Sequence, residues 1–164
     1  MKKLLSIMIA LFVFLPIACD DGKSTPTGSV KITVTRDSTD GYVLAGLYKS
    51  IAGMTTPGTL PDYTATTFPE LNATTSPVEI IINNVAVGDY YVTGTLDSNA
   101  YGTSGFGNPC STIYDIYFIH EGKTYATIAT ANAVTINENQ ETLVSITIND
   151  AHIFDAPTCT AMGF

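Results

Sequence analysis

The stretch "VEIIINNVAVGDYYVTGTLD" (residues 78–97) decides the fold of this protein. Along both halves of the stretch, every second residue belongs to one inward set. The members of this set are Val78, Ile80, Ile82, Tyr90, Val92, Gly94 and Leu96. A period of two is typical of a strand with one buried face. The segment "NNVAVG" links the halves, with Gly88 placed for a positive φ. The stretch therefore predicts two strands joined by a tight connection.

The same alternation continues upstream. In "SVKITVT" (residues 29–35), Val30, Ile32 and Val34 face one way, and "YVLAGLYK" (42–49) follows as a second strand. The residues between them, "DSTDG", have turn chemistry. Residues 50–76 are rich in Thr and Pro without a clear period. We expect a long connection there, with room for one short edge strand.

Two hairpins are predicted in the second half of the chain. The first turns at Glu121-Gly122, with strands near Ile113–Ile119 and Thr124–Thr130. Its weakest part is "YATIATANA", whose alanines leave a helical turn open as an alternative. The second hairpin is "AVTINENQETLVSITIN", which turns at "NENQ". Its inward residues are Val144, Ile146 and Ile148.

The strand count and spacing predict an all-β fold. About eight short strands, rich in β-branched residues and Tyr, favour an antiparallel sandwich of immunoglobulin-like or transthyretin-like kind. A small β-barrel is the alternative. We expect residues 28–164 to form this single domain, with a C-terminal tail, because its length suits one ordinary core.

A short motif within the opening stretch resembles a known sandwich family. In carboxypeptidase-regulatory and prealbumin-like domains, a strand leads into an "n-v-x-x-G-x-Y-x-V" turn-and-strand that ends near Asp-x-Asn. The matching positions are Asn84, Val85, Gly88, Tyr90, Val92, Asp97 and Asn99. The resemblance covers about 20 residues, and it implies a fold but no activity.

The amino terminus, "MKKLLSIMIALFVFLPIAC", has the three-part plan of a secretory signal. Lys2 and Lys3 precede a run of 14 residues, Leu4 to Ile17, which is apolar except for Ser6 and Pro16. That run is shorter than the ~20 residues that a membrane-spanning helix needs. A small residue and a cysteine then follow.

This ending resembles bacterial lipoprotein signal peptides, in which the cysteine becomes the first residue of the mature protein. Ile17, Ala18 and Cys19 match that pattern, while Pro16 departs from it. The resemblance implies that residues 1–18 are a removed signal peptide and that Cys19 carries a covalent lipid. Residues 19–27 would be the lipidated tether. Ordinary cleavage that leaves a free thiol is the alternative.

The cysteine count fits this interpretation. The three cysteines are Cys19, Cys110 and Cys159, and an odd count leaves one thiol unpaired in an exported protein. If Cys19 carries lipid, the other two can pair. Their separation is 49 residues, so the bond would contribute about 4 kcal/mol. The implied compartment is oxidising, at the bacterial cell envelope; two unpaired buried thiols are the alternative.

Charge limits the partners. Without the signal, 5 basic residues remain against 15 acidic ones, for a formal charge of −10. Nucleic acid is therefore not expected, because phosphate binding needs clustered Lys and Arg. An acidic surface also repels anionic headgroups. We expect the membrane to be reached through the lipid, on the inner or outer membrane, with an envelope protein as a possible further partner.

One loop partly matches the sequence pattern of a calcium-binding loop. Residues 97–108 match the D-x-[DN]-x-[DN]-G pattern at Asp97, Asn99 and Gly102 but have Asn108 in place of the bidentate Glu. One carboxylate is a poor cage for Ca²⁺. We therefore predict no metal and no cofactor besides the lipid, with Asp97 and Asn99 as the weak metal candidates, in a solvated loop.

No catalytic residues are predicted, because the sequence has neither a G-x-S-x-G elbow nor an HExxH motif. The function expected from the sequence is a non-catalytic binding or structural module on an envelope membrane. Two alternatives stay open. One is a calcium- or carbohydrate-binding module that uses the loop 97–108, and the other is a hydrolase assembled from scattered acids.

Overall fold

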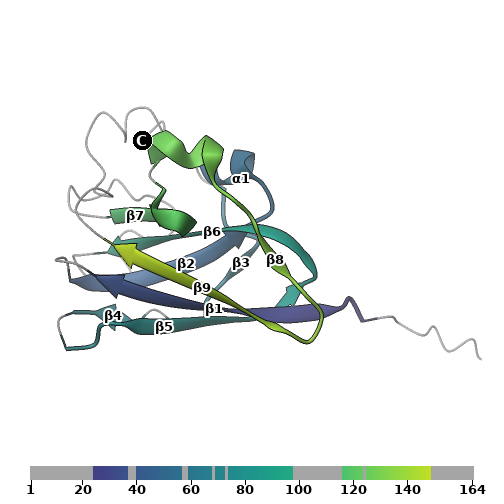
Figure 1. Cartoon of the computed structure of the whole chain (residues 1–164), viewed down its shortest axis with the longest axis horizontal. Helices are drawn as coiled ribbons and strands as arrows, with labels where there is room; N and C mark the ends of the chain where they lie inside the picture. The colour runs from purple at the N-terminus through teal and green to yellow at the C-terminus, as the bar shows by residue number, and fades with distance from the viewer. Residues whose placement is uncertain are drawn as a thin grey trace, which may run out of the picture.

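The structure is a computed structural model. It describes residues 24–36, 40–56, 59–67, 69–72, 74–97, 116–123 and 125–148. Its strands form two sheets that pack face to face (Figure 1), and the described strands do not close into a barrel. The predicted all-β sandwich is confirmed.

The smaller sheet has three strands. In spatial order these are β5 (Val78–Ala86), β1 (Thr27–Arg36) and β9 (Glu141–Ile148). The larger sheet has six strands. These are β3 (Tyr63–Thr64), β2 (Gly41–Tyr48), β6 (Gly88–Asp97) and β7 (Ile116–Ile119), with β4 (Glu70–Leu71) beside β2 and β8 (Val134–Ile136) beside β6.

The core between the sheets follows the predicted alternation. Every residue assigned inward on β1, β5, β6 and β9 is buried. The largest buried side chains in this core include Tyr90, Phe118, Ile32, Leu47 and Leu71. The Tyr63 ring packs edge-on against Tyr90, with ring centroids 5.6 Å apart. The predicted strand phases are therefore correct for these four strands.

A second apolar cluster covers the outer face of the six-stranded sheet. It contains Tyr48, Met54, Ile119, Ile128 and Ala131. Short helical segments supply part of it: α1 (Ile51–Thr55) and the 3₁₀ helix η2 (Tyr125–Thr130) lie together beside this sheet (Figure 1). Because β6 is enclosed on both faces, its polar Thr93 is buried, where its hydroxyl donates to the Phe118 carbonyl at 3.0 Å.

The predicted strand Thr124–Thr130 is wrong, and the helical alternative for this segment is correct. The chain does reverse at Glu121 and Gly122, with φ values of 67° and 66°, within the 3₁₀ helix η1 (His120–Gly122). It then coils into η2 instead of extending. The reason is packing, because the helical turn buries Ile128 in the outer cluster.

The second predicted hairpin also differs, although its turn is where the sequence placed it. β8 pairs with β6, and β9 pairs with β1, so the two strands belong to different sheets. The turn backbone bonds to β1: Ser29 N–H donates to the Gln140 carbonyl and Asn139 N–H donates to the Thr27 carbonyl, both at 2.9 Å. These bonds direct β9 onto β1, and the result is the one parallel pairing among the described strands.

Gly28 allows this close approach of the turn. A Cβ atom at Gly28 would lie 2.3 Å from the Asn137 carbonyl oxygen and 2.8 Å from that of Gln140. No side chain fits at such distances, because the atoms that would have to move are backbone. The long connection 50–76 is also more structured than predicted, with α1, β3 and β4 inside it.

The two neighbouring isoleucines on β5 provide a matched test of strand phase. Ile82 is 2 % exposed and Ile81 is 46 % exposed. We expect Ile82→Ala to lower the free energy of unfolding by about 2–5 kcal/mol, through lost transfer energy and a residual cavity. Ile81→Ala should change it by about 0.5 kcal/mol or less. Urea denaturation of both variants measures this, and equal losses would show that the phase of β5 is wrong.

Candidate functional site

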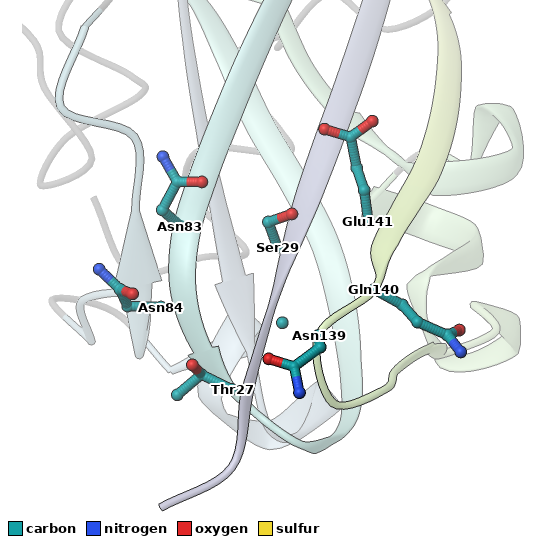
Figure 2. Close-up of a pocket in the computed structure, with 8 residues that line it drawn as sticks. Thr27, Ser29, Asn83, Asn84, Asn139, Gln140 and Glu141 are labelled. Atoms are coloured by element: carbon teal, nitrogen blue, oxygen red, sulfur yellow. The ribbon is translucent and has the colours of Figure 1, made fainter. Parts of the chain in front are cut away.

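An open pocket of about 550 Å³ lies at one end of the three-stranded sheet, where β1 begins. Its lining comes from the first residues of β1, the last part of β5 and the turn that leads into β9 (Figure 2). We call it the amide pocket, because four of its eight lining residues carry a side-chain amide. The lining residues are Thr27, Gly28, Ser29, Asn83, Asn84, Asn139, Gln140 and Glu141.

A β-bulge shapes the β5 side of the amide pocket. Gly28 pairs with Val85 and Val30 pairs with Ile82, so Asn83 and Asn84 together face the single residue Ser29. Asn84 has a φ of 57°, a conformation that Asn tolerates better than most residues. Bulges bend a strand locally and redirect its side chains. The bulge thus places two amides at this end of β5 where a regular strand would present one.

The tight turn before β9 shapes the opposite side. Asn139 also has a positive φ, of 55°, and its backbone is bonded to Thr27 as described above. In Figure 2 its amide points toward the start of β1, while the Gln140 side chain points away from the strand. Val87 N–H, between β5 and β6, donates to the Pro26 carbonyl at 3.0 Å. The backbone around the amide pocket is therefore held by hydrogen bonds on both sides of β1.

The charge in the amide pocket is slightly negative. Glu141 is its one charged lining residue. The nearest cation along β1 is Lys31, which forms an ion pair with Glu79 Oε1 at 2.7 Å. The hydrogen bond to Glu79 raises the pKa of Lys31, against a lowering by desolvation, and the charges of Glu79 and Glu141 add to the rise. Lys31 is thus a cation already engaged by a carboxylate.

The chemistry of this lining is that of neutral hydrogen bonding. A side-chain amide both donates and accepts, and a Ser or Thr hydroxyl does the same. Such a site suits a ligand with paired donors and acceptors and no net charge. These residues are not recognisable as a site from the sequence, where "NN" belongs to a predicted connection and "NENQ" to a predicted turn. Their meeting depends on β1 lying between β5 and β9.

The sequence-predicted site residues lie elsewhere or outside the described residues. Cys19, Cys110 and Cys159 fall outside them, and so do Asn99 and most of the loop 97–108. Asp97 is the last residue of β6, where it is 1 % exposed. The expectation that Asp97 is solvated is therefore wrong, because it is a buried strand residue that pairs with Tyr42 of β2.

No metal site is formed by the residues that the structure describes: no three side chains among His, Cys, Asp and Glu gather in that part of the chain. His120 begins η1, and its Nδ1 is a buried atom without a hydrogen-bond partner within the same part. The neighbouring Glu121 accepts two hydrogen bonds from the Asn132 amide, at 2.9 and 3.1 Å.

A second group of titratable residues lies around Asp62, and none of its members lines the amide pocket. The Tyr48 hydroxyl donates to the Thr59 carbonyl at 3.0 Å, and Asp62 Oδ2 accepts from Lys49 N–H at 2.8 Å. Burial, with the charge of Asp62, raises the pKa of Tyr48 to about 12. Burial and a hydrogen bond with Tyr63 raise the pKa of Tyr90 to about 12. These phenols are neutral near neutral pH and serve as packing groups.

Comparisons with protein-family models, with curated proteins and with solved structures found no match for this chain.

The raised pKa of Tyr48 predicts a loss of stability in alkali. The folded state holds the phenolic proton up to about pH 12, whereas the unfolded chain releases it near pH ~10. The stabilisation is thus complete below about pH 10 and falls as pH rises toward 12. We expect Tyr48→Phe to show a shallower fall than wild type. Urea melts between neutral and alkaline pH measure it, and parallel curves would contradict the assignment.

Proposed function

We propose that the protein is an exported bacterial lipoprotein whose β-sandwich is a non-catalytic binding module held at an envelope membrane. The observation that carries this proposal is the sequence at the amino end. Lys2 and Lys3, the apolar run and the Ala18-Cys19 pair have the order and spacing of a lipoprotein signal. One lipid-modified cysteine would then supply the attachment, and the acidic domain would stay in the aqueous phase.

The distance between Cys19 and the fold supports a short anchor. β1 begins at Thr27, eight residues after Cys19. An extended chain spans at most ~3.3–3.6 Å per residue, so the sandwich would lie within about 30 Å of the lipid attachment. Within the described part of the chain, no helix has the length and apolar character to cross a membrane.

The amide pocket supports a binding role. Its neutral amides and hydroxyls are groups that position a ligand by hydrogen bonds. The pocket adjoins the start of β1, so in the anchored protein it would belong to the end of the sandwich next to the tether (Figure 2). A ligand held there would be a component of the envelope surface or of the space just above it.

Replacement of Cys19 tests the anchor. We expect Cys19→Ser to abolish incorporation of a radioactive fatty acid, because serine offers no thiol for the thioether. The variant should also be released from the membrane fraction, as an uncleaved or soluble protein. Cys110→Ser is the matched control, and it should keep the label. Metabolic labelling followed by membrane fractionation measures both, and label retained on the Cys19→Ser protein would refute the lipoprotein assignment.

The remaining two cysteines are proposed to form a disulfide. We expect intact mass spectrometry after alkylation without reductant to show no modified cysteine in the mature domain, and two modified cysteines after reduction. Loss of the bond by Cys159→Ser should lower stability by about 4 kcal/mol, on the chain-entropy model for a 49-residue separation. Two alkylated thiols without reductant would rule out the Cys110–Cys159 bond.

A further inference from the structure

We propose that the amide pocket, together with the exposed aliphatic residues beside it, is a binding site for a neutral saccharide. The proposal deepens the binding role proposed above and rests on it, but it does not depend on the lipid anchor. It commits to uncharged sugars, either free or as the headgroup of a glycolipid, because both present the same hydroxyls to the pocket.

The hydrogen-bonding groups of the site match sugar hydroxyls. Each hydroxyl is a donor and an acceptor at once, and a side-chain amide offers both functions on one rigid group. Asn83 and Ser29 lie on neighbouring strands, and Asn139 approaches from the turn (Figure 2). The pocket volume of about 550 Å³ falls within the ~300–1,000 Å³ of typical small-molecule sites.

The backbone that presents these groups is fixed before any ligand binds. The bulge at Asn84 sets the position of Asn83. The turn is fixed by its two backbone hydrogen bonds to β1, one donated by Asn139 and the other by Ser29. A preorganised site loses less conformational entropy on binding than one built on free loops. Gly28 contributes by leaving room for this turn.

Apolar surface lies directly beside the amides. Ile81 and Leu143 both pair with Lys31, one from each neighbouring strand, so the three residues form a row across the sheet. The row lies on the outer face, two residues along each strand from Asn83, Ser29 and Glu141. Ile81 is 46 % exposed and Leu143 is 72 % exposed. Ile81 and Leu143 thus flank Lys31, and their exposed aliphatic groups can contact the C–H face of a sugar ring.

The charges of the site disfavour anions and calcium. Glu141 disfavours an anion, and the one nearby cation along β1, Lys31, is paired with Glu79. A calcium ion requires several negatively charged oxygens, whereas the pocket lining has a single carboxylate. A neutral ligand with many hydroxyls satisfies the amides without opposing Glu141.

Saturation-transfer NMR tests the proposal. The lipidated protein is held in a zwitterionic detergent that has no sugar headgroup. The probes are glucose, galactose, mannose and N-acetylglucosamine with their homodisaccharides, at millimolar concentration, and glucuronate is the anionic comparison. We expect transfer to at least one neutral sugar and weaker transfer to glucuronate. Vesicles that carry a glycolipid with the same sugar form the second arm.

Variants connect the signal to the site. Asn83→Ala removes one amide, and Asn139→Gly removes another while keeping the positive φ. Each should weaken binding roughly three- to tenfold, the effect of one lost hydrogen bond, and Leu143→Ser should weaken it similarly by removing apolar contact. Asn132→Ala, an exposed amide outside the pocket, is the matched control. Circular dichroism confirms that each variant is folded.

Binding of free sugars or of the glycolipid alone, lost in the pocket variants and kept in Asn132→Ala, supports the proposal and identifies the source. Absence of transfer in both arms overturns it, as does binding that the Asn83→Ala and Asn139→Gly variants leave unchanged. A failure of this experiment with successful lipid labelling at Cys19 would leave the envelope lipoprotein standing and remove the saccharide site.

Discussion

The fold depends on β1 being hydrogen-bonded along both of its edges. β5 pairs with it on one side and β9 on the other, and its inward residues Val30, Ile32 and Val34 are fully buried. The first described strand is therefore completed only by the last one, across most of the chain. Such long-range pairing is slow to form, since the entropy of closing the loop is lost before the contacts repay it. The amide pocket exists because the ends of these three strands meet.

The second constraint is that the six-stranded sheet is covered on both faces. Its inner face meets β1, β5 and β9, and its outer face meets the cluster around Met54 and Ile128. Polar residues on β6 then have to be satisfied inside the protein, as Thr93 is by the Phe118 carbonyl. The outward Thr93 is thus buried as completely as the inward Val92, so the alternation of β6 identifies its phase and not the exposure of its outer face.

Some features of the fold could be predicted from the sequence and others could not. The difference depends on how far apart in the chain the interacting residues lie. The phases of β1, β5, β6 and β9 are set by a local period, so Ile82 and Val92 could be assigned inward without a structure. The helical form of η2 depends on Ile128 meeting α1 and β2, and the division of β8 from β9 depends on bonds between the turn and β1. Neither is encoded in neighbouring residues. The pocket was missed for the same reason, since Asn83 and Asn139 lie far apart in the sequence.

The parallel pairing of β1 with β9 also has a mechanical consequence. Eight registered pairs, from Ser29–Glu141 to Arg36–Ile148, join these strands. Because the strands run in the same direction, the chain enters β1 at one end of the ladder and leaves β9 at the other. Tension between those two points would pull the strands lengthwise past each other, so the hydrogen bonds share the load instead of opening one by one. A domain tethered through its amino end would thus meet pulling forces in shear, the direction in which a ladder resists most.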